Sequence, residues 1–180
     1  MKTFRFLGLA FIAALCAVST ASAQTATPVP NTKPDFSSLK FLIGTWQCKT
    51  TKNTNGRGAG RTETDTYAMS MDDHYLMLDS ISKPFDKART TSIVAKGYTA
   101  YDAATKTWYS YGFDNFGNFG FSTSPGMSGN EWRWTDKWNS GGGPLGVLVI
   151  TKVSDTKTTS IYTVKTPKGT ETNSDECTKG

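Results

Sequence analysis

The feature that most constrains this chain is a succession of short segments in which polar side chains alternate with apolar or aromatic ones. Turn residues separate these segments, and a period of two places successive side chains on opposite faces of a strand. The expected strands are residues 41–51, 61–70, 74–82, 92–101, 107–114, 118–124, 131–138, 146–153, 158–166 and 171–178. About ten short antiparallel strands predict an all-β fold, either a sandwich or an up-and-down β-barrel.

The first 23 residues have the pattern of a cleaved secretory signal peptide. Lys2 and Arg5 precede an apolar run, and an Ala-Ser-Ala sequence predicts cleavage after Ala23. The apolar run is shorter than the roughly 20 residues that a membrane-spanning helix needs, and no second run follows it. We therefore expect a mature protein that has no membrane span and is periplasmic or secreted.

The mature chain is expected to contain a tether and a single domain. Residues 24–37 include three prolines and no apolar pattern, which predicts a flexible linker. Asp35 is placed to cap a short helical turn at the start of the domain. Residues 38–180 are then long enough to form one barrel with a substantial core.

The charge pattern argues against nucleic acid as a partner. Loss of Lys2 and Arg5 with the leader takes 20 basic residues against 15 acidic ones to 18 against 15, a net charge of +3. The remaining charges are scattered, and no basic stripe indicates nucleic acid or an anionic membrane surface. Oligomeric state is left open.

Cys48 and Cys177 are the two cysteines that remain after cleavage, and an even number in an exported chain predicts one disulfide. Bonded cysteines have Cα atoms only about 4.4–6.8 Å apart. The bond would therefore bring the first and last strands together, which favours a closed barrel over a sandwich. Two cysteines and the single histidine are too few side chains for a structural zinc site, so no metal is expected.

The sequence resembles a known family at two places. Gly44-Thr45-Trp46, after a short helical turn, is similar to the start of lipocalin-type (calycin) barrels, in which the tryptophan packs across the barrel floor. Gly97, Tyr101, Asp102 and Trp108 follow the pattern of a bacterial family of lipocalin-like β-barrels labelled as a domain of unknown function. The resemblance, over residues 38–164, implies the barrel fold, makes Gly44 and Trp46 structural residues, and leaves the activity open.

Nitrobindin-type barrels, which are distantly similar, bind haem through a histidine near the C-terminus. The only histidine here is His74, in the third expected strand, so this ligation does not carry over. We expect no cofactor.

The strand at residues 61–70 has two faces, and neither is strongly apolar. One face carries Arg61, Glu63, Asp65 and Tyr67, and the other carries Thr62, Thr64, Thr66 and Ala68. Because buried charges are costly unless they are paired, we favour the interpretation in which the threonines face inward. In the alternative interpretation, Arg61, Glu63, Asp65 and Tyr67 form a binding wall.

Aromatic residues exceed what a small core requires, and a surplus of this kind can line an apolar pocket. Alternation places Tyr109 and Tyr111 on the face opposite Trp108, and gives Trp132, Trp134 and Trp138 the same parity. We take Tyr109, Tyr111, Trp132 and Trp134 as further ligand-binding candidates, together with His74. For His74, the simpler interpretation is a turn residue beside Asp72 and Asp73.

These features favour an exported protein that binds a small apolar or aromatic ligand, and not an enzyme, because no catalytic motif is found. One alternative is an enzyme that uses His74 or the Glu63 and Asp65 pair as acid and base. Another is a structural envelope module whose barrel is filled by side chains. A hollow or filled interior separates the last possibility from the other two.

Overall fold

The computed structural model describes residues 33–54, 60–84 and 90–180. The expected signal peptide and residues 24–32 of the expected linker lie outside the described residues. No helix in the described part of the chain is long and apolar enough to span a membrane.

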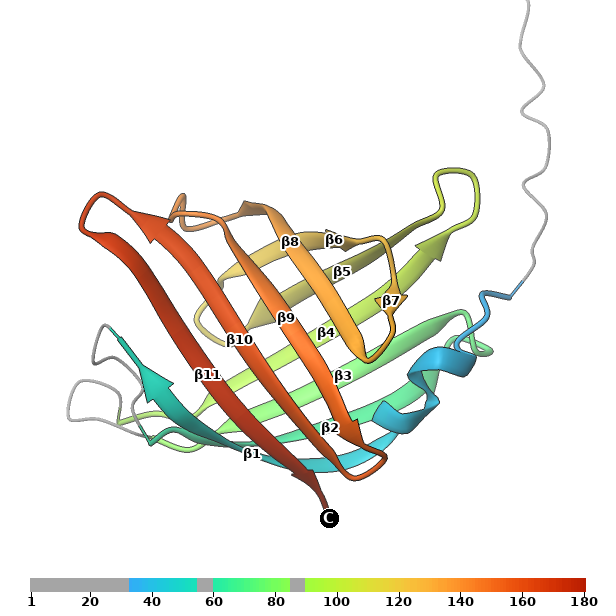
Figure 1. Ribbon diagram of the computed structural model, residues 1–180, viewed down its shortest axis with the longest axis horizontal. Helices are drawn as coiled ribbons and strands as arrows, with labels where there is room; N and C mark the ends of the chain where they lie inside the picture. The colour runs from blue at the N-terminus through green and yellow to red at the C-terminus, as the bar shows by residue number, and fades with distance from the viewer. Residues whose placement is uncertain (1–32, 55–59, 85–89) are drawn as a thin grey trace, which may run out of the picture. The chain divides into compact units, whose positions relative to one another are not determined.

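The described residues form a closed antiparallel β-barrel of ten strands with one additional short strand (Figure 1). The strands are β1 (Gly44–Asn53), β2 (Thr62–Ser70), β3 (Tyr75–Ser82), β4 (Ile93–Asp102), β5 (Thr107–Asp114), β6 (Phe119–Ser124), β7 (Met127–Ser128), β8 (Glu131–Asn139), β9 (Gly146–Ser154), β10 (Lys157–Thr166) and β11 (Gly169–Lys179). Strands adjacent in sequence pair with one another except β6 and β7: both of these pair with β8, and β11 pairs with β1. The predicted all-β, up-and-down barrel is confirmed.

The disulfide joins the pair of strands at which the end of the chain meets its beginning. Cys48 on β1 lies directly opposite Cys177 on β11, and the two sulfur atoms are bonded. The predicted disulfide is confirmed, and so is the inference that the first and last strands are neighbours. A disulfide is compatible with an exported protein.

One end of the barrel is filled by a buried apolar group that we call the floor cluster. It comprises Phe36, Leu39, Leu42, Leu76, Trp108, Trp132 and Trp134. Leu39 and Leu42 come from the 3-10 helix η1 (Ser37–Leu42), which Figure 1 shows beside the start of β1. Asp35 Oδ1 accepts a hydrogen bond from the Ser37 backbone N–H (2.8 Å). Because Phe36 packs against Trp108, the packed part of the chain begins before Ser38, inside the expected linker.

Gly44 and Trp46 lie at the start of β1, next to the end of η1. Gly44 has φ +123°, a left-handed conformation, and a Cβ there would meet the Lys179 side chain at 2.9 Å. Trp46 is 1% exposed. Its Nε1–H donates to the Leu42 carbonyl (2.6 Å), which ties the end of η1 to the barrel wall.

Candidate functional site

Beyond the floor cluster, the barrel interior is hollow and holds a cavity of about 930 Å³. Leu42 and Trp46 border the cavity near the packed end, and Asn53, the last residue of β1, borders it away from that end together with its partner Asn173 on β11. Its lining also includes apolar side chains, notably Leu78, Ile93, Leu148 and Ile150. Volume and mixed lining are those of a small-molecule site, which typically measures about 300–1,000 Å³.

Strand β2 turns its charged face toward this cavity, so our preferred orientation for this strand was wrong. Arg61, Glu63, Asp65 and Tyr67 all line the cavity. The strand register explains why: Trp46 pairs with Asp65, and Cys48 pairs with Glu63. Directly paired residues point to the same face of a sheet. Because Trp46 lines the cavity, Asp65 must also face inward, and the threonines of β2 face outward.

Four of the lining residues form what we call the charged wall: Arg61, Glu63, Asp65 and Asp175. Arg61 Nη2 lies 3.4 Å from Glu63 Oε2 and 3.8 Å from Asp175 Oδ1. The Ser82 hydroxyl donates to Glu63 (3.0 Å), and the Thr50 hydroxyl donates to Asp175 (2.6 Å). Glu63 and Asp175 are therefore both compensated by a shared guanidinium and by hydroxyl donors.

Asp65 is less well compensated, because no ion pair reaches it among the described residues. It is 9% exposed, and its Oδ1 has no hydrogen-bond partner. Its Oδ2 lies 3.6 Å from Cys48 Sγ, which has no proton to donate because it is bonded to Cys177. Burial, followed by the charge of Glu63, raises the pKa of Asp65 to about 6, although the Ser80 hydroxyl opposes this shift. The cavity therefore contains a buried carboxyl group that changes protonation near neutral pH.

Two tyrosines supply neutral hydroxyl groups to the interior. Burial is the main cause that raises the pKa of Tyr67, and the charges of Asp65 and Glu63 add to it. Burial also raises the pKa of Tyr162, whose hydroxyl donates to Asp136 Oδ2 (2.8 Å). Both phenols therefore stay protonated over the whole neutral range.

The sequence-based candidates omitted several interior polar residues: Asp136, Tyr162, Asn173 and Asp175. Asp136 also accepts from Ser122 (2.7 Å) and borders a smaller pocket of about 250 Å³ between β5, β6 and β8. A signal for two of the four was present in the sequence. Asn173 and Asp175 have the same parity as Cys177, and alternation places them on the face of the strand that carries the disulfide.

Cys48 Sγ and one carboxylate oxygen each of Glu63 and Asp65 lie within 4.8 Å of one another. A metal ion there would need more donors than this set offers, because the sulfur is held in a disulfide and only two carboxylates remain. The arrangement does not make a metal site while the disulfide is intact.

The predicted aromatic candidates do not join the charged wall. Tyr111 is 50% exposed on the outer face of β5, and its ring stacks on Tyr109 at a centroid distance of 6.4 Å. Trp132 and Trp134 belong to the floor cluster, with ring centroids 4.6 Å apart, and do not line the cavity. Of the predicted aromatic candidates, Tyr111 is thus on the outer surface, and Trp132 and Trp134 are in the floor cluster.

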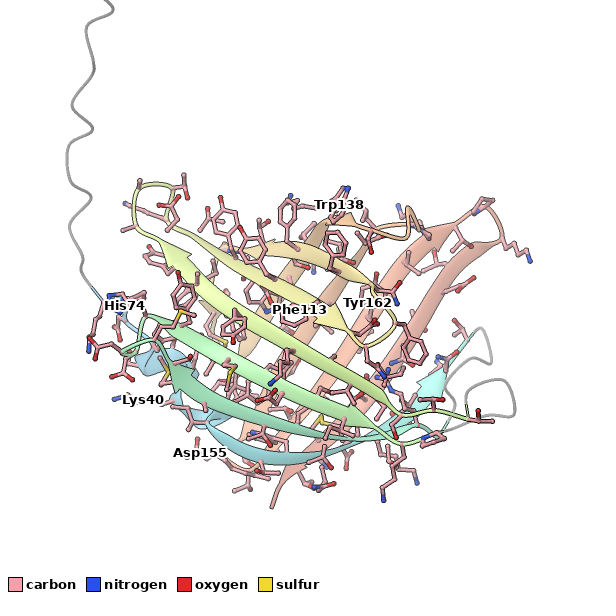
Figure 2. All side chains as sticks on the ribbon, turned by 180° about the vertical axis from the view of Figure 1, so that it is seen from behind. Lys40, His74, Phe113, Trp138, Asp155 and Tyr162 are labelled. Atoms are coloured by element: carbon pink, nitrogen blue, oxygen red, sulfur yellow. A yellow bond between two sulfur atoms is a disulfide. The ribbon has the colours of Figure 1, made fainter. Side chains whose placement is uncertain are left out.

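Trp138 lies outside despite its parity with Trp132 and Trp134. The β6–β8 pairing shifts register between Phe121 and Ser122, which pair with Trp138 and Asp136, so Lys137 is an extra residue in β8. Trp138 is 45% exposed, and Figure 2 labels it together with Phe113.

His74 lies in the turn between β2 and β3, outside the cavity lining. Its ring Nδ1 is 3.1 Å from the carbonyl oxygens of both Met71 and Asp72. Met71, Asp72 and Asp73 all have positive φ angles, and Lys33 pairs with Asp72 at 3.1 Å. The contacts are those of the simpler interpretation, a turn histidine (Figure 2).

No protein-family model matches this chain, and no curated protein matches it. Among solved structures, the chain is similar to EF1p2_mFAP2b, whose structure contains bound DFHBI, with 13% identity and a TM-score of 0.36 over 79% of this chain and 96% of that one. It is also similar to a redesigned β-barrel, b11L5F_LGL, with 16% identity and a TM-score of 0.36 over 76% of this chain and 90% of that one. Both likenesses are too remote to assign a family or a ligand.

Proposed function

We propose that this protein is an exported binding protein that holds a small organic molecule inside its barrel. The observation that carries the proposal is the cavity of about 930 Å³, because a structural module with a filled barrel would not keep such a space. The leader-like N-terminus and the Cys48–Cys177 bond support export.

The proposal is for binding without chemical turnover. Of the acid and base groups considered from sequence, the cavity brings together Glu63 and Asp65 but not His74. Glu63 already accepts a hydrogen bond from the Ser82 hydroxyl and pairs with Arg61, so both of its oxygens have partners within the protein.

A neutral fluorescent probe, N-phenyl-1-naphthylamine, tests whether the cavity binds ligands. We expect a saturable rise in its fluorescence with wild-type protein and a loss of affinity of at least about 10-fold in Ala95→Phe, since Ala95 lines the cavity. Val94→Phe is the matched control, because the neighbouring side chain is exposed on the outer face. Equal affinities in all three proteins, or no saturable binding to wild type, would contradict the proposal.

A further inference from the structure

We infer that the cavity selects ligands that carry a cationic N–H group, such as a protonated amine or an amidinium, and that Asp65 is the residue that binds this group. This inference rests on the proposed function and narrows it to one chemical class. The sequence predicts an apolar or aromatic ligand. The inferred ligand has an apolar part and, in addition, one positively charged group.

The first support is the charge balance of the lining. The charged wall contains three carboxylates, Glu63, Asp65 and Asp175, against one guanidinium, Arg61. Arg61 contacts Glu63 and Asp175 and is therefore already committed to two of the three carboxylates. With all three carboxylates ionised the wall has a net charge of −2, Asp65 has no ion-pair partner of its own, and an anionic ligand would increase the imbalance.

The second support is the unpartnered oxygen of Asp65. A buried polar atom without a hydrogen bond costs free energy, and native structures rarely keep one without a reason. Asp65 lines the cavity, and its unpartnered Oδ1 is buried at the cavity wall, so a rotation of the carboxyl group presents this oxygen to a ligand without rearrangement of the sheet. An N–H donor satisfies this acceptor, whereas a quaternary ammonium group has no proton to donate.

The surroundings suit the remainder of such a ligand. Trp46 lies directly opposite Asp65 on β1 and Tyr67 follows Asp65 by two residues on β2; both border the cavity, and aromatic rings pack against apolar groups. Leu148 and Ile150 line the cavity from β9 and offer an apolar surface to the body of the molecule. The site therefore combines one charged anchor with a largely non-polar enclosure.

A matched series of fluorescent probes tests the inference: monodansylcadaverine as the cation, its N-acetyl derivative as the neutral analogue, and dansyl-6-aminohexanoic acid as the anion. We expect the cation to bind wild type about 10- to 100-fold more tightly than the neutral probe, as for a hydrogen bond between charged groups. The anion should bind most weakly. Asp65→Asn should remove the preference for the cation and leave the affinity for the neutral probe within about threefold.

Asp79→Asn is the matched control, because Asp79 is a β3 carboxylate on the outer face that pairs with Lys96. It should leave all three affinities unchanged. Equal binding of cation and neutral probe to wild type, or an unchanged preference in Asp65→Asn, would overturn the inference but leave cavity binding intact. If none of the three probes binds wild type, both the inference and the proposed function are contradicted.

A second measurement needs no variant. The titratable groups that face Asp65 are Arg61, Glu63 and Tyr67 from β2 and Asp175 from β11, and the groups from β1 and β3, the disulfide and Ser80, do not titrate. Because Asp65 must be ionised to bind a cation, the affinity of wild type for monodansylcadaverine should rise by about 10-fold between pH 5 and pH 7.5. A flat profile for the cation would overturn the inference, as would an equal rise for the neutral probe.

Discussion

The floor cluster and the charged wall each contain one buried polar atom without a hydrogen-bond partner, and the two atoms differ in their surroundings. Among the described side chains, these atoms are Trp132 Nε1 and Asp65 Oδ1. Trp132 is enclosed by other rings, with Trp108 at 6.3 Å and Trp134 at 4.6 Å between centroids. Asp65 borders an open cavity. An unpaired donor inside a packed cluster is a cost of packing, whereas an unpaired acceptor at a cavity is a point of attachment for a ligand.

The two regions should therefore respond differently to mutation. In the floor cluster, removal of a side chain takes away packing and lowers the free energy of unfolding at any pH. On the charged wall, removal of the Asp65 charge relieves a desolvation penalty and changes ligand preference. The predictions below test this contrast, beginning with the largest expected effect.

The disulfide lines the cavity beside the charged wall, since Cys48 Sγ lies 3.6 Å from Asp65 Oδ2. Replacement of both cysteines, Cys48→Ser and Cys177→Ser, should lower the free energy of unfolding by about 5 kcal/mol, because the bond closes a loop over 129 residues of sequence. Denaturant titration of the double variant against wild type measures this difference. Free-thiol assay of denatured, unreduced wild type is the companion test. Two reactive thiols per chain would refute the bond itself.

Trp46→Ala should lower the free energy of unfolding by about 3–5 kcal/mol, because it empties a buried site and leaves the Leu42 carbonyl without its donor. Trp138→Ala is the control with the same change of side chain on the outer face, where we expect a cost below about 1 kcal/mol. Chemical denaturation of both variants gives the comparison. Similar costs at the two sites would mean that Trp46 is not buried in the folded protein.

Asp65→Asn should make the protein more stable than wild type at pH 8 but not at pH 4. The pKa of Asp65 is about 6 in the folded state against roughly 3.9 in an unfolded chain, so the folded state holds the proton more tightly. Wild type therefore loses stability as pH rises from about 4 through 6, by about 3 kcal/mol from this group. Asp65→Asn has no such group and should escape this loss.

Denaturant midpoints of wild type and Asp65→Asn are measured at several pH values. The effect is the change with pH in the difference between the two midpoints. Asp79→Asn controls for removal of an outer carboxylate, and its difference from wild type should stay within about 1 kcal/mol. A constant difference between wild type and Asp65→Asn from pH 4 to pH 8 would show that Asp65 is not desolvated in the folded state.

The strands could be predicted from sequence because their signals are local. Alternation and turn residues such as Asp102, which accepts from the Ala104 N–H and the Thr105 hydroxyl, fix where strands end. The expected range 107–114 coincides with β5, and the other expected ranges differ from the observed strands by a few residues at their ends. The pairing of Cys48 with Cys177 followed from residue count and from the expected export of the chain.

The direction in which each face points could not be predicted so well, because it depends on neighbouring strands. Both faces of β2 are polar, and only its register with Trp46 fixes Asp65 inside. Tyr111 and Trp132 both lie on strands rich in aromatic residues. Tyr111 is exposed on the outer face, whereas Trp132 is buried in the floor cluster. The extra residue Lys137 reverses the alternation within β8, and nothing in the local sequence marks it.

The smallest effect is expected at His74, which belongs to neither region. Axial ligation of haem by histidine needs a ring nitrogen directed at the iron from the wall of a cavity. His74 lies in the β2–β3 turn, where its Nδ1 contacts the Met71 and Asp72 carbonyl oxygens, and it does not line the cavity. Titration of the protein with haemin, followed in the Soret region, should therefore give the same result for wild type and His74→Ala. Tight, saturable binding of haemin by wild type that is lost in His74→Ala would contradict this expectation. It would show that His74 is a haem ligand at a site outside the cavity.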